Sequence, residues 1–241
     1  MTKETNEKRH SKDCMICGQE LEYFEKYKDL ECLYCHKKFK SNVSCKDGHY
    51  VCDSCHSMSG NDLIENYCKN TDKVNPIEMA IEIMKNPLIN MHGPEHHFLV
   101  PAVLIASYYN IKDEKKNKIK KLAVAKMRAK DVKGGICGFY GNCGAAVGTG
   151  IFMSIITEAT PLTKENWGLA NLMTGTSLIE ISKTGGPRCC KRNVFTAIKT
   201  ASKFADEYLE TKMYDYKEYK PLCTFKSNNK ECLKLECPYF K

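Results

Sequence analysis

The chain contains 15 cysteines among its 241 residues, and their spacing points to metal binding. Because cytosolic thiols are kept reduced, so many cysteines in a chain of this kind favour metal ligation over disulfides. Two thiolates with two residues between them can bind one ion from a single tight turn, and a second such pair completes a tetrahedron. The structural zinc ligands that we expect near the start of the chain are Cys14, Cys17, Cys32, Cys35, Cys45, His49, Cys52 and Cys55.

The sequence leaves two pairings of these ligands open. Sequential pairing would give the second ion the ligands Cys45, His49, Cys52 and Cys55. Cys68 would then compete with His49 for the fourth position. Residues 45–52 also resemble the middle of RING-type cross-brace domains, in which the pairs interleave. Interleaving would give one ion the ligands Cys32, Cys35, Cys52 and Cys55. In either case a unit of ~60 residues with little core draws its stability from metal.

A second group of cysteines lies near the end of the chain. Cys223, Cys232 and Cys237 offer three thiolates, and a fourth ligand is needed to complete a site. Cys189 or Cys190 can supply it, which would tie the C-terminal segment back onto the body of the protein. We expect an iron–sulfur cluster of the 4Fe-4S type at these five residues, with zinc as the alternative occupant.

A histidine-rich motif precedes a predicted helix. His92, Glu95 and His96 match the H-x-x-E-H pattern of inverted zinc proteases. That chemistry needs both histidines on one helical face, and Gly93 and Pro94 between them argue against it. Glu95 is favoured in the first helical turn by the helix dipole, and we expect His96 to point outward from it.

Three predicted helix starts, at Pro94, Cys143 and Pro187, could point into one pocket. They would combine His96 and Cys143 with Cys189 or Cys190, whose thiolates are favoured by the helix-terminal amides. The candidate catalytic residues are therefore His92, Glu95, His96 and Cys143. The candidate substrate-binding residues are Arg188, Arg192, Gly144 and Gly148, although the two glycines could equally serve helix–helix packing.

Helical patterns dominate after residue 75 and supply the elements that would position these groups. Asn75 can cap a helix opened by Pro76, and Pro101 would bend or restart the next one. The remaining helices are expected at 114–130, 143–158, 164–181 and 187–210. We therefore expect a mainly α fold. Its parts are a flexible N-terminus (1–13), a small zinc-ribbon or RING-like module (14–70), a helical domain (71–215) and a Cys-rich tail that docks on it (216–241).

The motifs also resemble those of a known family. The segments His-Gly-Pro-Glu-His-His (92–97) and Gly-Pro-Arg-Cys-Cys-Lys-Arg (186–192), with the glycine-rich segment around Cys137 and Cys143, are similar to an uncharacterised family of cysteine-rich proteins from anaerobic archaea and bacteria. The resemblance covers about residues 14–241 and implies metal binding in an anaerobe without implying an activity. Residues 143–148 also look like a segment of small helical redox proteins.

Composition narrows the function further. The net charge is +8, but only four of the 37 cationic residues are arginine and the lysines are dispersed, so nucleic acid is not expected as the main ligand. No apolar run approaches the ~20 residues of a membrane span, and the first residues lack the apolar stretch of a signal peptide, which predicts a cytoplasmic protein.

We expect an oxygen-sensitive redox or sulfur/one-carbon transfer enzyme that acts on a small anionic substrate or with a redox partner. The alternatives are a non-catalytic zinc-binding adaptor and an RNA-binding protein that acts in RNA modification.

Overall fold

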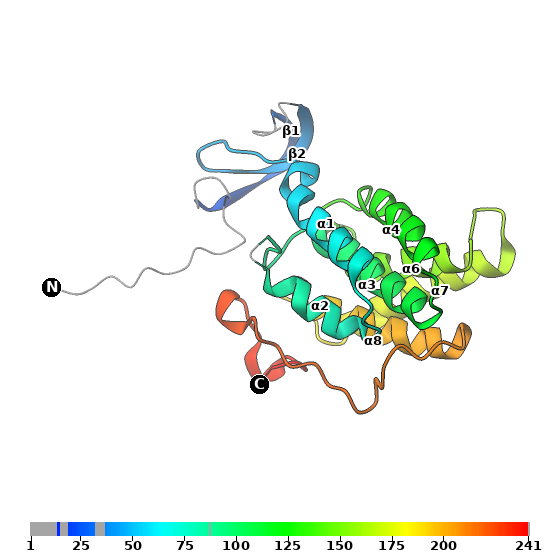
Figure 1. Ribbon diagram of the computed structural model, residues 1–241. Helices are drawn as coiled ribbons and strands as arrows, with labels where there is room; N and C mark the ends of the chain where they lie inside the picture. The colour runs from blue at the N-terminus through cyan, green and yellow to red at the C-terminus, as the bar shows by residue number, and fades with distance from the viewer. Residues whose placement is uncertain (1–13, 15–18, 32–36, 87, 241) are drawn as a thin grey trace.

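The computed structural model describes residues 14, 19–31, 37–86 and 88–240, with the side chains of 54–59 left undescribed. The fold is mainly helical, and a small two-stranded sheet stands at its N-terminal end (Figure 1). The expected flexible segment 1–13 lies outside the described residues. No helix in the described ranges is long and apolar enough to cross a membrane.

The sheet is a hairpin of β1 (Leu21–Glu31) and β2 (Lys38–Cys45). The strands pair antiparallel, with Leu21 opposite Cys45 and Glu31 opposite Lys38. Most β1 side chains are exposed, so the hairpin has little apolar core. A two-stranded sheet is marginally stable by itself, and this one must gain support from its surroundings.

The helical body is built around α3 (Glu95–Ile111), in which every residue from Phe98 to Ser107 is buried. Five helices pack on it: α1 (Asp53–Asn70), α2 (Pro76–Lys85), α4 (Lys115–Ala129), α6 (Gly144–Ile156) and α8 (Cys190–Tyr208). The four-residue α5 (Ile136–Phe139) precedes α6, and α7 (Lys164–Ser182) covers α6 and α8 from outside. Pro101 lies within a single α3.

Local signals placed most helices correctly. Asn75 Oδ1 accepts hydrogen bonds from the Ile77 and Glu78 backbone N–H groups, at 3.0 and 3.4 Å, and Pro76 opens α2 as predicted. The expected helix start at Pro187 was wrong, because α8 begins at Cys190. The Cys189 Sγ accepts from the Arg192 N–H at 3.4 Å and so caps this helix.

The C-terminal segment, which contains two short 3-10 turns at Lys226–Asn228 and Lys234–Glu236, returns along α8 (Figure 1). The Tyr239 ring packs edge-on against Phe195 with 5.3 Å between ring centroids, and its hydroxyl lies 3.0 Å from Thr196 Oγ1. The Tyr239 carbonyl also accepts from the Cys223 N–H at 2.7 Å, which closes the segment into a loop. The tail cysteines are thereby held beside the first turns of α8.

Candidate metal centres

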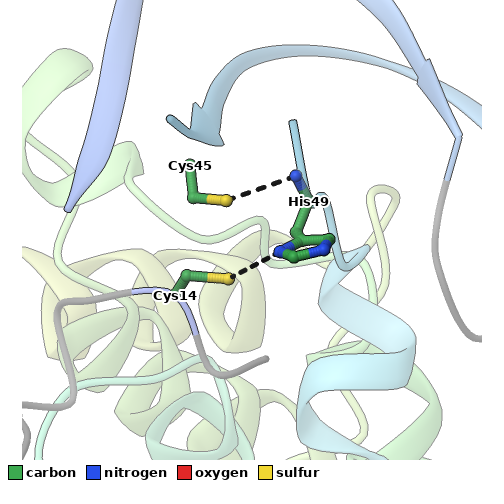
Figure 2. A group of neighbouring side chains, drawn as sticks. All are labelled: Cys14, Cys45 and His49. Carbon is green, nitrogen blue, oxygen red and sulfur yellow. Dashed lines mark hydrogen bonds between the residues drawn. The ribbon is translucent and has the colours of Figure 1, made fainter. Parts of the chain in front are cut away.

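The first candidate centre lies beside the hairpin. The donor atoms of Cys14, Cys45 and His49 all lie within 4.8 Å of one another, and this group could hold a metal ion (Figure 2). Cys14 Sγ is 3.9 Å from His49 Nδ1, and the His49 N–H lies 3.3 Å from Cys45 Sγ. Gly48, at φ +80°, allows the tight turn between Cys45 and His49.

This grouping joins Cys14, before β1, to Cys45 at the end of β2 and to His49 just after it, which is compatible with the interleaved pairing. Cys17, Cys32 and Cys35 lie outside the described residues, and the side chain of Cys55 is not described. Cys52 is buried at the start of α1. The expected competition of Cys68 for this site was wrong. Cys68 is fully buried in the core of the helical body, where burial raises its pKa.

The second candidate centre joins the start of α8 to the tail. One small cavity is lined by four cysteines, namely Cys189, Cys223, Cys232 and Cys237. Backbone N–H groups two or three residues further along the chain donate to three of the sulfurs, at 3.4 Å for Cys189 and Cys223 and at 3.5 Å for Cys232. Burial raises the pKa of Cys189 and Cys223, and these N–H donors oppose the rise.

Two larger cavities lie on the other side of the α8 start. One of about 570 Å³ is lined by His97, Cys137, Arg188 and Cys190, together with residues of the hairpin. Another of about 740 Å³ shares Cys137 and Arg188 with it and adds Cys143. Burial raises the pKa of Cys190 to about 12, and the Arg188 charge opposes this while Cys143 and Cys137 add to it.

Contacts between the hairpin side and the helical body run along the walls of these cavities. The Gly134 N–H donates to Asp53 Oδ2 at 3.0 Å, at the start of α1. Tyr23 of β1 faces Phe139 of α5 with 6.5 Å between ring centroids. The cavity wall therefore combines residues from the N-terminal hairpin and from the glycine-rich segment before α6.

The histidine-rich motif divides between the cavity and the core. His92 lines the 570 Å³ cavity, and burial lowers its pKa to about 4. Glu95 is fully buried and accepts from the Asn90 N–H at 2.8 Å, and burial raises its pKa to about 6. His96 is 1% exposed rather than outward-pointing, with its Nδ1 3.1 Å from the Gly93 carbonyl oxygen. Glu95 and His96 line none of the three cavities described here.

The expected substrate-binding residues occupy two kinds of position. Arg188 is exposed and lines both large cavities. Arg192 is almost fully buried, and its guanidinium donates to the Gly185 and Pro187 carbonyls at 2.7 and 3.1 Å, so it braces the loop before α8. It also lines the 740 Å³ cavity and the tail cavity.

Both candidate glycines lie where α6 packs on α3. A Cβ on Gly144 would lie 2.1 Å from the His97 ring, and one on Gly148 would lie 2.8 Å from Pro101 Cδ. Their closest neighbours in the fold are therefore side chains of α3.

Three residues at these centres were not among the candidate site residues predicted from the sequence. His97 and Cys137 line the 570 Å³ cavity, whereas His96 had been expected there. Lys191 is buried beside the tail, where its Nζ donates to the Met84 carbonyl at 2.9 Å and stands 4.4 Å from the Phe225 ring centroid. Burial lowers the Lys191 pKa to about 8. The sequence held a signal for two of them. His97 is the third histidine of the 92–97 motif, and Lys191 is the basic residue that directly follows Cys190.

Comparison with known proteins places the chain in a family. No curated protein and no solved structure matches it. A family model described as a family of unknown function, DUF5714, matches residues 64–240, which include both cavities' helical walls and the tail cysteines. Because the match covers well over half of the chain, the protein belongs to this family.

Proposed function

We propose that this chain is an iron–sulfur and zinc-binding protein that carries out a redox or a sulfur/one-carbon transfer reaction on a small anionic substrate. The observation that carries the proposal is the convergence of Cys189 with the three tail cysteines on one cavity. Four thiolates are the usual protein ligand set of a 4Fe-4S cluster. When bound, such a cluster would supply one-electron chemistry.

The surroundings of the four sulfurs support a bound metal centre. Backbone N–H donors at 3.4–3.5 Å stabilise thiolate over thiol, and hydrogen bonds of this kind tune the potential of iron–sulfur centres. The buried cations Lys191 and Arg192 lie next in the chain to the ligating turn, where they offset the negative charge of several thiolates.

The spacing of the sulfurs favours a cluster over a single ion. Within the part of the chain that the structure describes, only Cys14, Cys45 and His49 have all donors within 4.8 Å of one another. A tetrahedral zinc ion with Zn–S bonds of about 2.3 Å would hold its four sulfurs at least that close. The tail sulfurs are more widely spaced, as a polynuclear occupant requires. We assign zinc to the hairpin centre formed by Cys14, Cys45 and His49.

The large cavities are suited to the substrate. A volume of about 570 Å³ is in the range of small-molecule sites, and Arg188 and Lys133 line it. Arg188 would hold an anionic group. His92, kept neutral by burial at ordinary pH, could accept a proton there.

Anaerobic purification of the full chain tests this proposal. Iron, zinc and acid-labile sulfide are assayed together with the electron paramagnetic resonance spectrum of the reduced protein. We expect iron and sulfide in equal amounts, and their loss in Cys223→Ala and Cys232→Ala. Cys68→Ala serves as the control, because this core thiol lies at none of the centres and its loss should leave the iron content unchanged. A colourless protein that holds zinc alone would overturn the iron–sulfur assignment.

A further inference from the structure

We propose a further metal centre, distinct from the hairpin and tail centres, whose ligands are Cys137, Cys143, Cys190 and His97. Its donor set is three thiolates and one imidazole. This combination binds borderline and soft metals. No three of these donor atoms, all of them in described residues, lie within 4.8 Å of one another, a wider spacing than a single zinc ion would hold, so the occupant would be an iron–sulfur cluster. The inference does not depend on the function proposed above, because none of these four residues lines the tail cavity.

The three thiols come from three turns that meet at the two large cavities. Cys137 lies in α5 and lines both cavities, Cys143 lines one and Cys190 lines the other. Asn193, one turn after Cys190 in α8, donates its amide to Cys143 Sγ at 3.5 Å. This bond holds the start of α6 against the first turn of α8, the turn that begins with Cys190. Cys137, which lines both cavities, lies between the two.

His97 is oriented as metal-binding histidines are. Its Nδ1 lies 3.0 Å from the Val132 carbonyl oxygen, which can only accept, so Nδ1 carries the proton and Nε2 keeps its lone pair. The ring lies on Gly144, where an added Cβ would be 2.3 Å from Nε2. Gly144 follows Cys143 directly, so the free nitrogen of His97 is presented beside that cysteine.

The vicinal cysteines separate this centre from the tail centre. Cys189 lines the tail cavity, whereas Cys190 lines the 570 Å³ cavity. All three thiols are partly accessible rather than sealed in the core, and each lines at least one of the two large cavities, so a bound metal would border them. Arg188, which lines both large cavities, would stand next to it.

Metal-dependent protection from alkylation tests the proposal. The anaerobically purified full chain is divided, one half is stripped of metal with a chelator, and both are pulsed with iodoacetamide before mass-spectrometric quantification of each cysteine peptide. We expect Cys137, Cys143 and Cys190 to be alkylated several-fold more slowly in the metal-loaded half. Cys68 should be unreactive in both halves because it is fully buried.

Substitutions at the proposed ligands test whether the slower alkylation of these cysteines comes from this centre. Cys143→Ala and His97→Gln should remove the protection of Cys137 while Cys223 and Cys232 remain protected. Loss of iron together with sulfide in these variants is the result expected of a cluster, and loss of zinc alone would contradict it. Cys137 lies in a short exposed segment, so Cys137→Ala should fold and still lose one centre's metal. Equal alkylation of Cys137 in both halves, or unchanged metal content in all three variants, would overturn the proposal.

Discussion

Cys189 and Cys190 are consecutive in the chain, yet their side chains line different cavities, one facing the tail and the other facing the space beneath the hairpin. Cys189 lies just before α8 as its cap, and Cys190 is the first residue of the helix. This change of backbone conformation between neighbours sends the two sulfurs in different directions. Two centres that share this pair would lie close together, which favours electron transfer between them.

Replacing the two cysteines one at a time should therefore remove different metals. Cys189→Ala is expected to lower the metal content of the tail centre and leave Cys137 protected from alkylation. Cys190→Ala is expected to do the reverse. Metal analysis combined with peptide mapping checks both variants. Identical losses in the two variants would mean that the cysteines serve one centre.

Removing metal should free the tail without unfolding the helical body. The tail is held by a few contacts, such as that of Tyr239 with Phe195, whereas the body has a large apolar core around α3. After chelation, trypsin is expected to cleave at Lys226 and Lys230, while the far-ultraviolet circular dichroism changes little. A tail that stays resistant after complete metal removal would contradict this expectation.

An ion pair between α1 and α4 should contribute pH-dependent stability. Hydrogen bonds from Lys126 and Lys69 outweigh the effect of burial and hold the pKa of Glu65 below its ordinary value. A lowered carboxyl pKa stabilises the fold above the unfolded-state pKa of about 4.5, and this contribution is lost as the pH falls further.

Glu65→Gln is accordingly expected to cost about 1 kcal/mol at pH 7 and progressively less below pH ~4.5, as measured by urea unfolding. Asp62→Asn is the matched control, because Asp62 pairs with the same Lys126 but its side chain is 65% exposed. Its cost should be only a few tenths of a kcal/mol. If Asp62→Asn cost more stability than Glu65→Gln, then Asp62 rather than Glu65 would be the main stabilising partner of Lys126.

Replacing Gly148 and Gly175 with alanine should change the stability of the protein in opposite directions. A Cβ on Gly148 would lie 2.8 Å from Pro101 Cδ and 3.0 Å from the His97 carbonyl oxygen, so Gly148→Ala should destabilise the protein by about 1–3 kcal/mol. Gly175 is in α7 with open space around it, and Gly175→Ala should stabilise the protein by about 0.5–1 kcal/mol. Thermal unfolding of both variants checks the pair, and stabilisation by Gly148→Ala would show that α6 and α3 are not in contact.

The sequence predicted where the helices lie better than it predicted which of their side chains face a cavity. Asn75 and Pro76 fixed the start of α2 because capping depends on a few adjacent residues. The choice of His96 over His97 failed because consecutive helical residues point about 100° apart, and only the packing of α3 decides which one faces the cavity. The start of α8 was misplaced because a cysteine sulfur acts as its cap, outside the usual set of capping residues.

It was harder to predict from the sequence which residues far apart in the chain meet at one cavity or in the core. The sequence offered Cys189 and Cys190 as equal partners for the tail, and only the direction of each side chain separates them. The α1 helix was not expected, because residues 53–62 are mostly polar and show no helical apolar period. Its later residues, including Cys68, were assigned to the zinc module although they pack in the core.

The hairpin forms a wall of the 570 Å³ cavity, with Tyr23 and Tyr27 of β1 lining it opposite His97 and Arg188. The family model begins only at residue 64, so this wall comes from a part of the chain outside the matched region. Cys14 and His49 line the same cavity, so a metal ion held by Cys14, Cys45 and His49 would stand at the rim of the space that Arg188 enters from the other side of the chain.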